Sequence, residues 1–328
     1  MKRAFAIPAS ALVALLLAGC GGGGGGGGPV PPPGLPATGT INSGSVLNVS
    51  GRSLDVVFQS SGFGAITQFV GLSTLSTSDP GGVRTASAAK PVGQYVNAYV
   101  PVGPDTSACN VSGTVTVTGD IANPLTVTPG DFLDYEWDDC DDGSGEVIDG
   151  FIGMTFTEFE GNLLSGQILL GVSLVVEVFR VVSGTDVNVT TGDLSLTIDS
   201  RGQPTTIIST LGSTLRIANG ASTDTLSDFS VTVTEDASVF PNNFTTDAIG
   251  SVTSTLFSGT VAYNMPIPFE SSGDKFPYKG EMVVFGADNS RVRIIAISEV
   301  EVRIQADYDG DGANDATIDT TWAALVDG

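Results

Sequence analysis

The chain has 328 residues, with 13 Lys and Arg against 36 Asp and Glu, three cysteines and no histidine. The net charge of −23 repels nucleic acid and anionic membrane surfaces, so neither is expected as a partner. Without histidine, the chain cannot form a Ser-His-Asp or Cys-His catalytic centre or a histidine-ligated zinc site.

Residues 1–19 have the form of a bacterial signal peptide. Lys2 and Arg3 precede an apolar run that is too short for a membrane span. The run ends in Leu17-Ala18-Gly19-Cys20, which resembles the cleavage box of bacterial lipoproteins. The resemblance implies cleavage before Cys20 and acylation of its thiol, while an ordinary secretory signal with an incidental cysteine is the alternative.

The resemblance also predicts a location. Gly21 is not the aspartate that, in the best-known sorting rule, retains lipoproteins at the inner membrane. We therefore expect a lipid anchor in the outer membrane, with the protein facing either the periplasm or the cell surface. Cleavage would remove Lys2 and Arg3 and no acid, which leaves 11 basic against 36 acidic residues and a net charge of −25.

Residues 20–42 are predicted to be a tether. Eight glycines follow Cys20 and favour a flexible coil, and Pro29–Pro36 favours a stiffer extended segment, neither of which is expected to pack into a core. Residues 43–105 are predicted to be irregular with one short helix. Within them, Val56–Phe58 looks strand-like, and residues 63–72 have weak helical spacing.

Residues 106–328 are predicted to form an antiparallel β domain. Val111–Thr118 alternates apolar and polar residues, and the even positions of Gln167–Val182 are apolar from Ile168 to Val178, which indicates a strand face in the core. Two hairpins are predicted from strands at 281–285 with 291–297 and at 300–306 with 316–322. The fold class is mainly β, either an antiparallel sandwich or one open, curved, barrel-like sheet.

Cys109 and Cys140 are the cysteines that remain once Cys20 is acylated. An oxidising compartment makes a disulfide between them the default, and two separately buried thiols are the alternative. A disulfide would leave no thiol for catalysis.

One loop has the pattern of a calcium site. It reads Asp307-Tyr-Asp309-Gly-Asp311-Gly-Ala313-Asn-Asp315, with carboxylates at positions 1, 3, 5 and 9 and the carbonyl of Ala313 at position 7. It resembles the calcium loops of EF-hands, dockerins and integrin-type propeller hairpins. Position 12 is Ile318 rather than the glutamate of an EF-hand, and the flanks are strand-like, so we expect a structural Ca²⁺ in a hairpin. A solvated acidic hairpin tip is the alternative.

A second acidic cluster of nine Asp and Glu spans residues 131–149 around Cys140. It could hold another cation, although such runs are more often solvated loops. Tyr135 and Trp137 lie inside it and indicate either strand packing or a platform for stacking sugars.

From Cys109 onward the chain resembles a group of uncharacterised bacterial lipoproteins and secreted β proteins. The residues that carry this resemblance are Cys109, Ser112–Val117, Gly130-Asp131, Cys140, Asp149-Gly150, Gly286–Arg293, the loop that begins at Asp307, and Thr320–Leu325. The resemblance implies the disulfide and the terminal hairpin, and no activity.

The sequence thus predicts a membrane-anchored envelope lipoprotein with a non-catalytic binding or structural role, stabilised by calcium and a disulfide. An envelope protein or a glycan would be its partner. The alternative is a carboxylate-dependent glycan-active enzyme or a carbohydrate-binding protein, although no carboxylate pair stands out.

Overall fold

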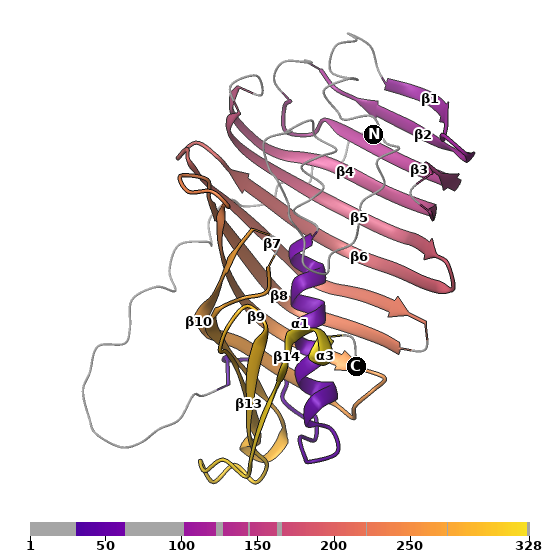
Figure 1. Cartoon of the computed structure of the whole chain (residues 1–328). Helices are drawn as coiled ribbons and strands as arrows, with labels where there is room; N and C mark the ends of the chain where they lie inside the picture. Colours follow the sequence, from indigo (N-terminus) through magenta and orange to yellow (C-terminus); the bar gives the residue numbers. More distant parts are fainter. Residues whose placement is uncertain are drawn as a thin grey trace, which may run out of the picture. The chain divides into compact units, whose positions relative to one another are not determined.

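One antiparallel sheet of 14 strands makes up most of the protein, and each strand pairs with its neighbours in the sequence (Figure 1). The computed structural model describes residues 31–62, 102–122, 127–143, 145–162, 166–220, 222–273 and 275–326. The open, mainly β sheet is therefore confirmed, and a two-sheet sandwich is not what forms. The strands are β1 (Val102–Ala108), β2 (Ser112–Asp120), β3 (Phe132–Asp141), β4 (Glu146–Asn162), β5 (Gln167–Ser183), β6 (Asp186–Asp199), β7 (Thr205–Asn219), β8 (Ser222–Asp236), β9 (Asn243–Ser254), β10 (Thr260–Ser272), β11 (Lys279–Phe285), β12 (Arg291–Ala296), β13 (Glu301–Asp307) and β14 (Ala316–Thr321).

The alternation in β5 determines which side chains enter the core, up to a break near its end. Ile168, Leu170, Val172, Leu174 and Val176 are all buried, as their spacing predicts. The expectation for Val178 is wrong, since its side chain is 50% exposed. Val178 lies between Val176 and Phe179, where the register of β5 shifts relative to both β4 and β6. An extra residue in a strand reverses which of the following side chains face the core.

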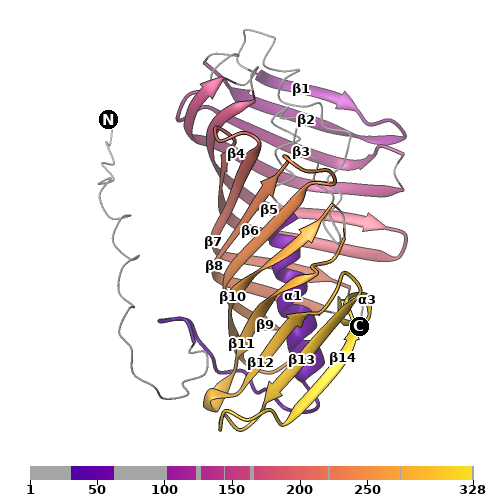
Figure 2. The same cartoon turned by 60° about the vertical axis from the view of Figure 1, so that its left-hand side comes forward.

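The helix α1 (Val46–Gly62) packs against the sheet, along strands β7 to β9, β11 and β12 (Figures 1 and 2). Val56 and Val57 are fully buried within it, so the strand-like interpretation of Val56–Phe58 is wrong. The carbonyl of Leu325 in α3 (Trp322–Val326) lies 2.3 Å from where a Cβ on Gly51 would be, so only glycine permits this approach. None of the described helices is long and apolar enough to cross a bilayer. The helical spacing noted at 63–72 lies outside the described residues.

The segment before α1 is attached to the sheet. Its residues Leu35 and Ala37 pack against a small cluster of Ala262, Val283 and Phe285, on the sheet face opposite the main core. The amides of Thr38 and Gly39 donate to the carbonyl of Thr260, at 2.8 and 2.7 Å. The expected tether of residues 20–42 is thus docked over its last part, while Cys20 and the glycines lie outside the described residues.

The two predicted terminal hairpins are confirmed as β11–β12 and β13–β14. The short 3-10 turn η2 (Ala287–Asn289) joins the first pair. Trp322, expected at the end of the last strand, begins α3 instead.

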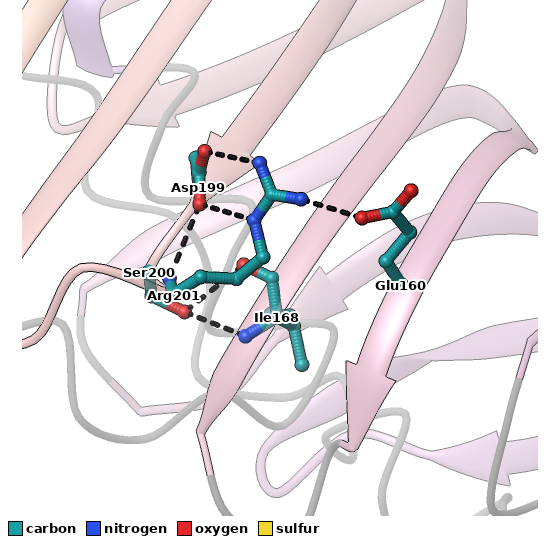
Figure 3. Close-up of polar contacts among 5 residues, drawn as sticks. All are labelled: Glu160, Ile168, Asp199, Ser200 and Arg201. Carbon is teal, nitrogen blue, oxygen red and sulfur yellow. Dashed lines mark hydrogen bonds and ion pairs between the residues drawn. The ribbon is translucent and has the colours of Figure 1, made fainter.

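Where strands β4 and β6 end, polar contacts hold the β4–β5 and β6–β7 hairpins together (Figure 3). The Arg201 guanidinium bridges Asp199 at the end of β6 and Glu160 on β4. The hydroxyl of Ser200 donates to the carbonyls of Gly166 and Ile168, at 2.6 and 3.3 Å. These contacts order the turn between β6 and β7.

Candidate functional site

The sequence-predicted calcium loop connects β13 to β14. Asp307 is the last residue of β13, and Asp315 directly precedes β14. Six consecutive cross-strand pairs, from Glu301 with Thr321 to Ala306 with Ala316, hold the two ends of the loop together. The carboxyl group of Asp307 is buried, whereas Asp309 and Asp315 are exposed, so an ion here would lie between protein and solvent.

The backbone of this loop folds onto its own carboxylates. Both oxygens of Asp307 accept amide hydrogen bonds, from Gly310 at 2.7 Å and from Gly312 at 2.9 Å. Both glycines have positive φ, at 74° and 95°, a region that residues with a Cβ rarely adopt. The amide of Tyr308 donates to Asp315 Oδ2 at 2.6 Å, which draws the end of the loop towards its start.

Three of the four predicted carboxylates come together. Oxygens of Asp307, Asp309 and Asp315 lie within 4.8 Å of one another, and no other group of three acidic or thiol ligands does so among the described residues. This separation suits one ion with Ca–O bonds of about 2.3–2.6 Å. Asp311 is not part of the group, and its carboxylate accepts the amide of Ala313 at 2.7 Å. Arg291 Nη2 lies 3.1 Å from Asp307 Oδ2 and partly neutralises that buried carboxylate.

Cys109 and Cys140 form the expected disulfide. Their Cα atoms are 5.6 Å apart, with 31 residues of sequence separation. Cys109 follows β1 directly, and Cys140 is buried in β3, so the bond joins the outermost hairpin of the sheet to the third strand.

The second acidic cluster does not form a comparable group. No three carboxylates in its described part come within 4.8 Å of one another. Asp131 is buried and accepts the amide and hydroxyl of Thr128 at 2.8 and 2.9 Å, which fixes the turn before β3. Tyr135 and Trp137 are buried on the opposite side of β3 from its acidic residues, with their rings stacked at 5.7 Å. They pack in the core, as the strand-packing interpretation predicts, and form no exposed platform.

Sequence reasoning missed a charged cluster between α1 and β8. Arg52 Nη1 lies 3.1 Å from Asp55 Oδ2 on the helix and 4.0 Å from Asp224 Oδ2 on the sheet. Asp224 is 2% exposed, and its Oδ1 has no hydrogen-bond partner. Burial raises the pKa of both carboxyl groups. Hydrogen bonds, of Asp55 with Gln59 and of Asp224 with Ser254, and the attraction of Arg52 only partly offset this. Arg52 and Asp55 are isolated polar residues in a segment whose sequence pattern indicates no buried charge, so no local signal marks them.

This cluster predicts a pH dependence of stability. A carboxyl group whose native pKa is raised binds its proton more tightly in the folded state, so its contribution to stability is lost as pH rises through the native pKa. Asp224→Asn should therefore flatten the fall in melting temperature above pH 4, and raise the melting temperature at pH 7 by roughly 2–4 °C. Arg52 keeps Asp55 as its partner in this variant.

Thermal unfolding of the wild type and Asp224→Asn between pH 4 and pH 8 measures the effect. The partly exposed Asp236, whose pKa is lowered by its hydrogen bonds with Ser238, is the matched control. Asp236→Asn should not raise the melting temperature at neutral pH. Parallel pH profiles for the wild type and Asp224→Asn would contradict the prediction.

A hollow of about 260 Å³ lies on the last hairpin, lined by Ile297, Glu301, Val302, Arg303, Asp319, Thr320 and Thr321. Arg303 donates two hydrogen bonds to Asp319, at 2.7 and 3.1 Å, and holds the pKa of that carboxyl below its usual value. The general acid of a glycosidase needs the opposite shift, towards a raised pKa. The two carboxylates of this hollow, Glu301 and Asp319, therefore give little support to glycan hydrolysis.

No protein-family model, curated protein or solved structure matches this chain. Its function must be argued from its own residues.

Proposed function

We propose that this protein is a lipid-anchored lipoprotein of the bacterial cell envelope, favouring the outer membrane, with a non-catalytic binding or structural role. Cys20 would carry the acyl chains, and the glycines from Gly21 to Gly28 would separate the sheet from the bilayer. Two or three acyl chains make anchoring durable without a transmembrane helix. The lipobox at 17–20 supports the anchor, and the disulfide suits an oxidising compartment outside the cytoplasm.

We propose further that the loop at 307–315 binds a structural Ca²⁺, with Asp307, Asp309 and Asp315 as carboxylate ligands. The convergence of these three carboxylates at the tip of one hairpin is the observation that carries the proposal. Asp311 and the carbonyl of Ala313 occupy the remaining ligand positions of the calcium-loop pattern, and Asp311 would have to exchange its hydrogen bond with Ala313 to join. The ion would relieve repulsion between carboxylates and stiffen the hairpin rather than take part in a reaction.

Calcium should therefore raise the melting temperature. At a tenfold excess over the dissociation constant, a ligand that binds only the folded state stabilises by about 1.4 kcal/mol, which corresponds to roughly 3–6 °C for a domain of this size. The dissociation constant of such a loop in an extracellular module is on the order of 10⁻⁴ to 10⁻³ M. Differential scanning calorimetry in EDTA and in millimolar CaCl₂ measures the shift.

Variants connect that shift to the loop. Asp309→Ala with Asp311→Ala should abolish it, and Asp309→Ala alone should remove more of it than Asp311→Ala alone. Asp186→Ala, at the exposed start of β6, should leave the shift unchanged. A wild-type protein whose melting temperature is the same in EDTA and in calcium would rule out the site.

The anchor has its own test. Cells given a labelled fatty acid should incorporate it into the wild type and into Cys109→Ser, but not into Cys20→Ser. Added protease should then degrade the sheet in intact cells if the protein faces the outside, and only after permeabilisation if it faces the periplasm. Equal labelling of Cys20→Ser and the wild type would show that Cys20 is not the acylated residue.

A glycan-binding or glycan-active protein is the second candidate, because the exposed face of the sheet is rich in hydroxyl groups. Cross-strand pairs such as Thr106 with Thr116 and Thr253 with Thr260 are hydrogen-bonded to each other, at 2.9 and 2.8 Å. Such ladders offer polar contacts, but Tyr135 and Trp137, the aromatics considered for stacking, lie in the core. The observations therefore support this candidate less than the first.

A further inference from the structure

The two edges of the sheet differ in how well they are protected against further pairing. In β1, Gly103-Pro104 coincides with a register irregularity between Val102 and Asp105. A bulge and a proline are devices by which natural sheets block an edge. In β14, all six residues pair in unbroken register with β13, and none is proline or glycine. Among the described residues no strand pairs with the outer side of β14, which forms the margin of the sheet in Figure 2.

The free backbone groups of β14 can be assigned. The amide of Trp322 donates to the carbonyl of Val300, at 3.1 Å. In an antiparallel pair, hydrogen bonds to the neighbouring strand recur at every second residue. Thr320, Ile318 and Ala316 therefore bond to β13. The amides and carbonyls of Thr317 and Asp319 face the open side, where an added strand would meet them, whereas Thr321 directly precedes α3 and caps it.

The hollow of about 260 Å³ adjoins this edge, and its lining combines charged and apolar side chains. It is smaller than the sites that hold drug-sized ligands, and it matches a single long side chain better. Arg303 and Asp319 neutralise each other, whereas Glu301 has no ion-pair partner among the described residues. Ile297 supplies an apolar wall and is 45% exposed. A side chain with an apolar stem and a positive end, Lys or Arg, fits this combination.

We propose that β14 is a docking edge for an extended segment of another protein, which adds a strand to the sheet and places a Lys or Arg side chain in the hollow beside Glu301. Main-chain hydrogen bonds would supply the affinity and the hollow the specificity, as in other cases of strand addition. The net charge of −23 favours a basic partner and opposes pairing with a second copy of this chain. The inference rests on the proposed binding role, but not on calcium or on the lipid anchor.

A synthetic peptide serves as the probe. Its ten residues alternate Thr and Val, with one central Lys, and it carries a fluorescent label. Anisotropy titration against the full chain should show saturable binding, and hydrogen exchange of the amides in 316–321 should slow. Replacing the central Lys with Glu should weaken binding at least about tenfold, and Glu301→Gln should remove most of that preference.

Backbone methylation of the peptide separates strand addition from simple charge attraction without any risk to protein folding. Two further peptides carry N-methyl groups on alternate residues, one on the odd and one on the even positions. Because only every second amide of a strand faces its neighbour, one of them should bind like the parent and the other at least about tenfold more weakly. On the protein, Thr317→Pro should block binding, whereas Thr317→Val keeps the amide and should not.

Several results would overturn the proposal. One is that the peptide shows no saturable binding, and another is that the two methylated peptides bind with equal affinity. A third is that the chain sediments as a dimer and the amides in 316–321 are already protected from hydrogen exchange without peptide. A failed peptide titration beside a calcium-dependent rise in melting temperature would remove the docking edge and leave the calcium proposal intact. Peptide binding beside a melting temperature that calcium does not change would remove the calcium proposal and leave the docking edge intact.

Discussion

Replacing Trp322 with Ala should lower the free energy of unfolding by about 3–5 kcal/mol, the usual cost of removing a large buried aromatic side chain. Trp322 is fully buried at the start of α3. Its ring packs edge-on against Phe269 at 5.7 Å and stacks with Phe276 at 6.0 Å, and its Nε1 donates to the carbonyl of Ser298 at 3.0 Å. The alanine variant loses these contacts and leaves the partly buried carbonyl of Ser298 without its donor. Urea denaturation monitored by far-UV circular dichroism measures the change.

Trp322→Phe is the matched control for this prediction. It keeps most of the ring and loses the hydrogen bond to Ser298, so it should cost only about 1–2 kcal/mol. Because α3 contacts α1 as well as β14, the alanine variant should also speed hydrogen exchange in α1. If Trp322→Ala and Trp322→Phe were equally stable, the ring would not be packed as described.

The strands were predictable because their sequence pattern has one dominant cause. In β5 and β13 one face meets the core and the other faces away from it, so apolar residues recur with period two. Where a bulge changes which face is inward, as at Val178, the pattern contains no trace of it, since Val176, Val178 and Phe179 are all apolar. The bulge is a property of the pairing with two neighbouring strands.

A short helix was predicted within residues 43–105, but the position and length of α1 were not, for a different reason. Its buried face includes Ser50, Ser53 and Ser60 beside Val49 and Val57, so the apolar signal with helical spacing is diluted. The hydroxyl of Ser50 donates to the carbonyl of Val46, and that of Ser60 to the carbonyl of Val57. Ser50 and Ser60 thus satisfy their hydroxyls within the helix, and all three serines are small enough to lie on its buried face. Pattern matching counted them as polar.

The candidate calcium loop could be found from the sequence because all its ligands lie within nine residues. Local spacing is enough to bring Asp307, Asp309 and Asp315 together once the flanking strands pair. The Arg52, Asp55 and Asp224 cluster joins residues more than 160 positions apart, and the free edge of β14 is defined by the strand order of the whole sheet. Neither follows from local spacing, and both required the fold.

Removing the disulfide with Cys109→Ala and Cys140→Ala should lower the free energy of unfolding by roughly 3–4 kcal/mol, given the 31-residue separation and the loop-entropy relation. The loss should not be uniform along the sheet. The bond holds the β1–β2 hairpin to β3 at the edge of the sheet, and β1 has β2 as its only strand partner among the described residues. Hydrogen exchange in β1 and β2 should therefore rise by more than exchange in β7 to β9, where α1 packs.

Reduction of the wild-type protein is the control, because it removes the same bond without changing any other atom. Denaturant midpoints of the reduced wild type and of the double variant should agree, and alkylation of the native protein without reductant should modify neither cysteine. If both thiols reacted in the native protein, the bond would be absent and the β1–β2 edge would depend on pairing alone. A double variant as stable as the oxidised wild type would show instead that the unfolded chain is already constrained near these residues, so that closing the loop removes little further entropy.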